Sequence, residues 1–137
     1  MRRVVPLSAL IGLLVLAAGL PGADASTATG FAFGRAGGNI RPFHVTVANS
    51  GAVQAYGPVT VGRTRITAVQ LVALNRVATE TSFTTLPAMT SCRGSLPDVA
   101  TTYIRVGART VRVHGGCVPR FQRLLKSLET SVRLMSG

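Results

Sequence analysis

The segment that most constrains the fold of this chain is bounded by its two cysteines, Cys92 and Cys117. Between them lie two runs of alternating polar and apolar residues, Thr102–Val106 and Thr110–His114, separated by Gly107-Ala108-Arg109. A period of two residues is typical of β-strands with one buried face. The segment therefore predicts a hairpin whose two ends are held by cysteines.

A disulfide between Cys92 and Cys117 is the expected pairing, because an even number of cysteines in an exported protein is usually paired. The alternative is two free or metal-bound thiols, although cysteines without a C-x-x-C spacing or a nearby pair of histidines make a poor metal site. The disulfide would close a loop of about 26 residues. The chain-entropy model gives such a crosslink about 3.5 kcal/mol of stabilisation.

Residues 1–25 have the pattern of a secretory signal peptide. Arg2 and Arg3 form a basic start, the apolar run Val4–Leu20 follows, and Ala23-Asp24-Ala25 forms a small-x-small cleavage site. The apolar run is short for a transmembrane anchor. We therefore expect a secreted protein in which residues 26–137 form a single small α+β domain.

The charge of the expected mature chain is strongly positive. Without Arg2, Arg3 and Asp24 it has 13 basic and 3 acidic residues, a net charge of about +10. Such a balance attracts acidic proteins, polyanions or anionic surfaces. The basic residues are scattered and not clustered in blocks, so solubility is an equally acceptable explanation of the charge.

Three strands are predicted before the first helix, beginning at Phe31-Ala32-Phe33 and continuing with Phe43–Val47 and Val53–Tyr56. The glycine-rich stretch Gly34–Asn39 predicts a loop or bulge between strands. A phosphate-binding loop is not expected there, because neither the characteristic lysine nor a helix follows Asn39.

Two helices are predicted. The first covers Ala68–Thr79, because Thr67 and Gln70 have the spacing of a capping box. The second starts near Pro119 and carries leucines at helical spacing, which fits a helix docked on a sheet, although its basic face would also suit a membrane surface. A long loop, Thr79–Asp98, is expected between the first helix and the hairpin.

The predicted order is β-β-β-α-β-β-α, which indicates an α+β fold: an antiparallel sheet with two helices packed on one face and one disulfide. No motif of a hydrolase, a metal site or a nucleotide site is present. The expected mature chain has only three carboxylates, which are far apart in sequence. We expect a non-enzyme without catalytic residues, metal, cofactor or small-molecule substrate.

The strand face that alternation turns away from the core carries aromatic and basic residues. Tyrosine and arginine are enriched in protein interface hot spots, and aromatic residues interleaved with bases also suit single-stranded nucleic acid. Export favours a protein or an envelope component as the partner, and an ordinary solvated face is the remaining alternative. The residues on this face are His44, Thr46, Gln54, Tyr56, Tyr103, Arg105, Arg112 and His114.

The stretch Phe33–Ile40, with Arg35 followed by Gly37 and Gly38, resembles a family of small bacterial proteins, the emfourin-like group. The order of elements along the expected mature chain is similar to that group as well. The resemblance implies an inhibitor of thermolysin-type metallopeptidases, with Arg35, Gly37 and Gly38 as the motif that contacts the partner. The partner is thus expected to be a protein, such as a secreted metallopeptidase, with an anionic surface as the alternative.

Overall fold

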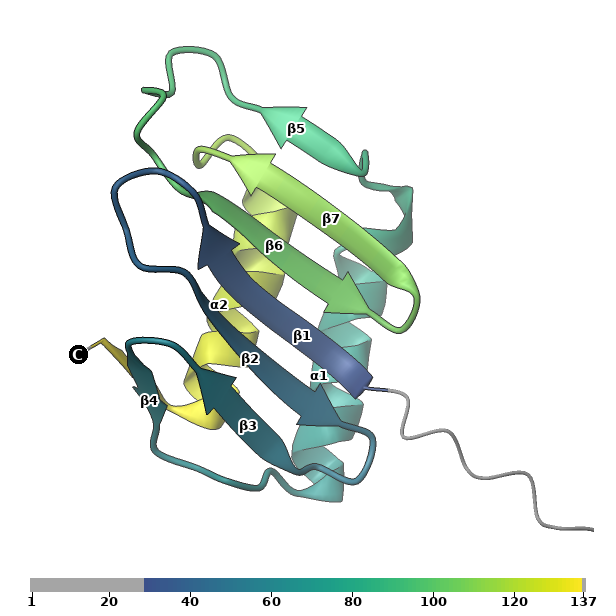
Figure 1. Ribbon diagram of the computed structural model, residues 1–137. Coiled ribbons are helices and arrows are strands. Elements are labelled where there is room, and N and C mark those ends of the chain that lie inside the picture. The colour runs from purple at the N-terminus through teal and green to yellow at the C-terminus, as the bar shows by residue number, and fades with distance from the viewer. Residues whose placement is uncertain (1–28, 137) are drawn as a thin grey trace, which may run out of the picture.

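The computed structural model describes residues 29–136, so the predicted signal peptide lies outside the described residues. The chain forms a six-stranded sheet, a separate pair of short strands and two α-helices on one face of the sheet (Figure 1). This arrangement confirms the predicted α+β class. The elements in chain order are β1 (Thr29–Ala36), β2 (Phe43–Ala48), β3 (Val53–Tyr56), β4 (Val59–Val61), α1 (Ala68–Glu80), a 3-10 turn (Phe83–Thr85), β5 (Met89–Ser91), β6 (Thr101–Val106), β7 (Arg109–His114), α2 (Pro119–Val132) and β8 (Leu134–Ser136).

The sheet has the strand order β3-β2-β1-β6-β7-β5. The first strand of the chain is therefore central, paired antiparallel with β2 on one side and with β6 on the other. The predicted hairpin of β6 and β7 is confirmed, and its turn is shorter than expected because Arg109 already pairs with Val106. Gly107 has a φ of +56° in this turn, a conformation that glycine adopts without strain.

Strand β1 is longer than the sequence suggested. The prediction placed Gly34-Arg35-Ala36 in a loop, and this was wrong, because all three residues pair with β6 and extend the strand to Ala36. Strand β1 extends further than predicted because it lies between two strands, β2 and β6, which provide partners for its backbone N–H and C=O groups as far as Ala36. The glycine-rich turn is thus reduced to the residues that follow Ala36.

The segment Thr79–Asp98, expected as a long loop, contains two short ordered elements. Strand β5 pairs in parallel with β7, so the prediction of a wholly antiparallel sheet was wrong at this edge. The predicted disulfide Cys92–Cys117 is present, with a Cα–Cα distance of 5.6 Å. It lies directly after β5, where the Cys92 amide also donates to the carbonyl oxygen of His114. The crosslink and the hydrogen bonds therefore hold an edge strand that is too short to be recognised from its sequence.

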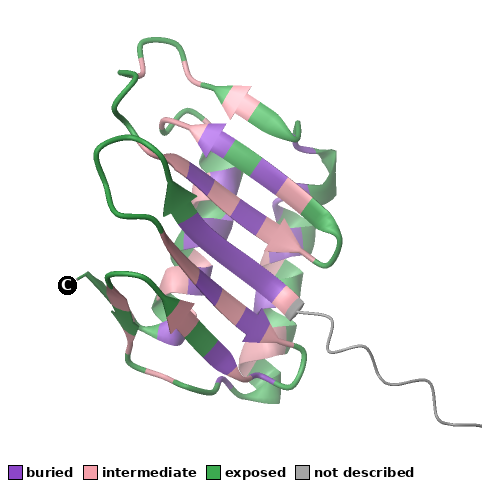
Figure 2. Ribbon diagram, viewed as in Figure 1, coloured by how far each residue is buried: buried purple, intermediate pink, exposed green. Residues whose placement is uncertain are grey.

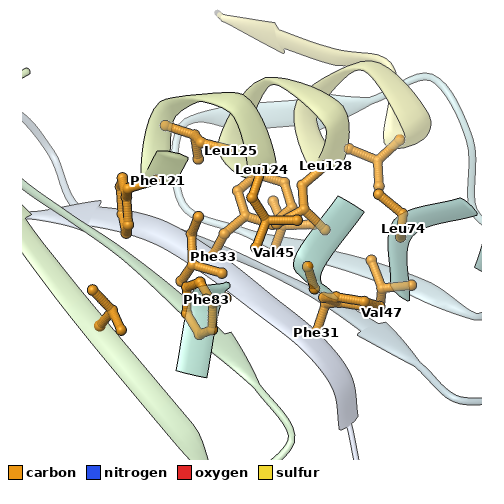
Figure 3. Packing of buried hydrophobic residues seen from close by; sticks show 14 of the residues in the cluster. Phe31, Phe33, Val45, Val47, Leu74, Phe83, Phe121, Leu124, Leu125 and Leu128 are labelled. Atoms are coloured by element: carbon orange, nitrogen blue, oxygen red, sulfur yellow. The ribbon is translucent and has the colours of Figure 1, made fainter. Parts of the chain in front are cut away.

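The core lies between the sheet and the two helices, as Figure 3 shows for side chains of β1, β2 and α2. Phe33 and Val45 point from the sheet toward Leu124 and Leu128, and all four are fully buried. The predicted capping box is confirmed, because the Thr67 amide donates to the Gln70 side chain and the Gln70 amide donates to the Thr67 hydroxyl. Helix α2 packs on the sheet through its apolar stripe, as predicted for a docked helix and not for a helix on a membrane surface.

Strands β4 and β8 were not predicted, since each has only three residues. They pair antiparallel with each other, beside the end of α2 (Figure 1). Arg133 ends α2 with a φ of +53° and turns the chain back, and its carbonyl accepts from the Gly62 amide. This contact attaches the end of the last helix to the connection between the first sheet half and α1.

Candidate functional site

The face of the sheet that points away from the helices is called the outer face here. Both helices lie behind the sheet in the view of Figure 1, and no other described element covers the strands on the near side. Figure 2 shows buried and less buried residues alternating along β2, β6 and β7, as expected for strands with one face in the core and one outside. His44, Tyr56, Tyr103, Arg105 and Arg112, five of the predicted aromatic and basic residues, are presented on this surface.

A row of outward residues crosses the sheet at one level, and we call it the central row. Tyr56 lies opposite His44, and His44 lies opposite Gly34 of the middle strand. On the other side Gly34 lies opposite Tyr103, and Tyr103 lies opposite Arg112. Residues from the two halves of the chain are thus combined in one line of aromatic, imidazole and guanidinium groups.

His44 and Tyr103 are linked across the middle strand. Nδ1 of His44 and Oη of Tyr103 are 3.0 Å apart and form a hydrogen bond. The opposite side of the imidazole contacts Tyr56 edge-to-face, with ring centroids 5.0 Å apart. Gly34 leaves room for this link, because it has no side chain between the two rings. The backbone also requires a glycine there, because a Cβ atom would lie 2.2 Å from the carbonyl oxygen of Phe43.

The pair of His44 and Tyr103 separates two shallow hollows in the outer face. The first, the tyrosine hollow, has a volume of about 230 Å³ and is bordered mainly by apolar and aromatic side chains such as Pro42, Phe43 and Tyr56. The second, the arginine hollow, has a volume of about 170 Å³. It is lined by Ala32, His44, Tyr103, Arg105, Thr110 and Arg112.

Two guanidinium groups dominate the electrostatics of the arginine hollow. Burial raises the pKa of the Tyr103 phenol above its ordinary value of 10.0, and the Arg105 and Arg112 guanidiniums partly offset this rise by favouring the phenolate. Tyr103 therefore stays a neutral hydroxyl at physiological pH. Nε of Arg105 is shielded from solvent and has no hydrogen-bond partner among residues 29–136.

No carboxylate residue of the described chain belongs to the strands that form the outer face. Glu80 at the end of α1 pairs with Arg123, and Asp98 contacts Asn39 in the loop before β6. Glu129 of α2 lies 3.9 Å from the Arg35 guanidinium, and burial raises the pKa of its carboxyl while Arg35 partly offsets the rise. The outer face of strands β1, β2, β3, β6 and β7 consequently carries positive charge without a carboxylate of its own.

The structure separates the other predicted site residues from the central row. His114 lies at the end of β7, where its ring is within hydrogen-bond distance of the Leu96 carbonyl, 3.1 Å away, and the Thr101 hydroxyl, 3.5 Å away. It therefore fastens the disulfide loop. Arg35 reaches toward α2, although it also borders the tyrosine hollow.

Gly37 and Gly38 form the turn after β1, both with positive φ. A Cβ atom on Gly38 would lie 2.2 Å from the carbonyl oxygen of Asp98, whereas one on Gly37 would meet no atom within 4 Å. Gly38 thus allows a close backbone contact between two loops. The contact role of both glycines and of Arg35 stays a prediction.

Sequence reasoning did not include Ala32, Gly34 and Thr110 in the site. Ala32 and Gly34 alternate with Phe31 and Phe33 along β1, so large residues enter the core and small ones face outward. This alternation of large and small residues along β1 is the feature of the sequence that could have identified Ala32 and Gly34 as outward-facing. It indicates an outward face on which the side chains of neighbouring strands can meet.

Residues 29–136 contain no group of three or more His, Cys, Asp or Glu side chains arranged to hold a metal ion. In the same part of the chain, no helix has the length and apolar character needed to cross a membrane. Comparisons with protein-family models, with curated protein sequences and with solved structures found no match to this chain.

Proposed function

We propose that this is an exported, non-catalytic binding protein whose outer sheet face docks onto an acidic protein surface. The observation that carries the proposal is the central row. Its two tyrosines, one histidine and one arginine stand on a face with no carboxylate on the five strands that form it. Tyrosine and arginine are the side chains that most often supply the binding energy of protein interfaces.

The rigidity of the row supports a preformed binding surface. His44 is held by Tyr103 on one side and by Tyr56 on the other, and the strands beneath are paired along their length. A surface whose side chains are already ordered loses little conformational entropy when a partner binds. The two hollows provide recesses for side chains of the partner.

Export is supported by two independent features. The leader-like residues 1–25 indicate secretion, and the Cys92–Cys117 disulfide fits an oxidising compartment. The resemblance of Phe33–Ile40 to the emfourin-like group supplies a first partner class, the secreted thermolysin-type metallopeptidases.

The test is a titration of a thermolysin-type metallopeptidase with residues 26–137, at low and at high salt. We expect a linear, stoichiometric loss of peptidase activity that persists at high salt, because salt screens the charge contacts with the acidic surface but not the burial of the aromatic side chains. Unchanged activity would remove this peptidase class as the partner. The docking proposal would then be tested by affinity capture from culture medium, with Tyr56→Ala as the comparison.

The matched variants are Tyr56→Ala and Met135→Ala. Both residues are about half exposed, at 53% and 51%, but Met135 lies in β8, outside the outer face. Truncation of a hot-spot tyrosine weakens binding by 2 kcal/mol or more, roughly thirtyfold. Equal affinity of the two variants for a captured or inhibited partner would contradict docking through the outer face.

A second candidate function is binding of an anionic envelope polymer, and one observation favours it. Arg41, Arg76, Arg93 and Arg133 are exposed and have no ion-pair partner among residues 29–136, so positive charge also covers surfaces outside the sheet. Such binding should weaken steeply with salt and should depend on total charge. A salt-independent affinity would exclude this candidate.

A further inference from the structure

We infer that the arginine hollow is a carboxylate-binding subsite, which receives an acidic side chain of the partner. The inference rests on the proposed function of the outer face and names the group that the face recognises. It depends on the unpartnered Nε of Arg105, on the position of Arg112 beside it, on the size of the hollow and on the neighbouring Tyr103 hydroxyl.

The guanidinium of Arg105 is unusual among the arginines of the described chain. Only Arg63 and Arg105 are half-buried, the others being exposed. Arg63 donates to the carbonyl oxygen of Ser131, 3.4 Å away. By contrast, the buried Nε of Arg105 has no hydrogen-bond partner, and Arg105 forms no ion pair, among residues 29–136. A buried N–H without an acceptor destabilises a protein. An incoming carboxylate would give this group the acceptor that the chain itself does not provide.

Arg112 adds a second set of donors to the same hollow. Arg112 lies opposite Tyr103, and Arg105 lies opposite Thr110, so the two arginines are diagonal neighbours on adjacent strands. Diagonal positions are about 7–8 Å apart at the backbone, which long side chains easily bridge. Two like charges that line the same hollow repel each other, and a shared anion between them offsets the repulsion.

The hollow has room for a small planar anion. Its volume of about 170 Å³ is large enough for a carboxylate group. Ala32 forms its floor, because a larger outward side chain on β1 would fill the space between the arginines. Guanidinium groups bind planar carboxylates through paired hydrogen bonds, which are shorter and stronger than neutral ones.

The hydroxyl of Tyr103 is placed to contribute a further donor. When His44 carries its proton on Nδ1, it donates to Tyr103 Oη. The phenol proton is then available to an anion in the hollow. The link between His44 and Tyr103 thereby connects binding in the arginine hollow to the ring that borders the tyrosine hollow.

The experiment is an NMR titration of ¹⁵N-labelled residues 26–137 with acetate, and in parallel with inorganic phosphate, at constant ionic strength. We expect acetate to shift the Nε–H signals of Arg105 and Arg112 and the backbone amide of Ala32, and phosphate to do so more weakly. Equal or tighter binding of phosphate would overturn the assignment to a carboxylate.

Three variants make the titration specific. Arg105→Gln and Arg112→Gln should each weaken acetate binding about tenfold or more, the loss expected for one charge-assisted hydrogen bond. Arg112 is exposed, so its replacement keeps the test valid if Arg105→Gln does not fold. Arg93→Gln removes the same charge from the disulfide loop and should change nothing. Equal losses in all three variants, or the absence of any shift in the wild type, would overturn the subsite.

The titration also separates this inference from the function on which it rests. If acetate binds at Arg105 but no protein partner is found, the subsite stands and the docking proposal fails. If a partner binds through Tyr56 with an affinity that Arg105→Gln and Arg112→Gln leave unchanged, docking stands and the carboxylate subsite fails.

Discussion

Replacement of Cys92 and Cys117 by alanine tests how far the edge of the sheet depends on its crosslink. The two cysteines are 25 positions apart, so the disulfide closes a loop that contains the whole β6–β7 hairpin. In the chain-entropy model, opening such a loop in the unfolded state lowers the free energy of unfolding by about 3.5 kcal/mol. The alanines themselves should add little, because Cys117 is exposed and Cys92 only partly buried.

A loss of this size is large relative to the 5–15 kcal/mol that a small domain usually has. It corresponds to a decrease in Tm of about 15 °C for a chain of this length. Urea unfolding followed by circular dichroism gives the difference directly, with the oxidised wild type as the reference. Ser91→Ala, next to Cys92 and exposed, is the control and should stay within about 0.5 kcal/mol of the wild type.

The result that refutes the reasoning is a loss below about 1 kcal/mol in the double variant with an unchanged urea dependence. It would show that the unfolded chain gains little freedom when the loop opens, contrary to the loop-closure argument. A loss far above 5 kcal/mol would instead locate the effect in the native state. The contacts of the Cys92 amide and of His114 with the loop would then be the next positions to change.

Three further predictions concern the helices. Leu128→Ala should lower the free energy of unfolding by about 3 kcal/mol in urea titrations, because its side chain is fully buried; an effect no larger than that of Val69→Ala, at a position 79% exposed, would contradict the packing. Thr67→Ala should cost about 1 kcal/mol through loss of the capping box, and Thr67→Ser should restore most of it. Burial raises the pKa of the Glu129 carboxyl, so folding favours its protonated form. Glu129 therefore contributes to the free energy of unfolding at pH values below its ordinary pKa of 4.5, and this contribution is lost as pH rises through the folded pKa. The wild type should therefore lose stability relative to Glu129→Gln as pH rises from below 4.5 through the folded pKa, and a pH-independent difference would rule this out.

The members of the outer face could be predicted from alternation alone, because successive side chains of a strand point to opposite sides of the sheet. His44, Tyr56, Tyr103, Arg105 and Arg112 were found in this way. Parity does not say which strands are neighbours, so the contact of His44 with Tyr103, 59 positions apart, could not be foreseen. The arginine hollow depends on the same neighbour relation, since Ala32 lies between β2 and β6.

Arg35 and His114 are two predicted site residues whose contacts in the structure could not be foreseen from the sequence. Arg35 was read as part of a loop motif, yet it belongs to β1 and reaches Glu129 on α2. His114 was placed on the outer face by parity, yet its ring contacts the disulfide loop. Both contacts join residues far apart in sequence. The partner of a long side chain therefore depends on which distant segment the fold places next to it.

The sequence by itself determined the elements whose signals are local. The capping box at Thr67, the alternation in Phe43–Val47 and the proline at the start of α2 each act on a few neighbouring residues, so their effect is visible without the rest of the chain. The tertiary structure decided the central position of β1, the parallel pairing of β5 and the strands β4 and β8. These features depend on which distant backbone groups meet and on how the apolar faces are covered together, and that choice is made only when the whole core is packed.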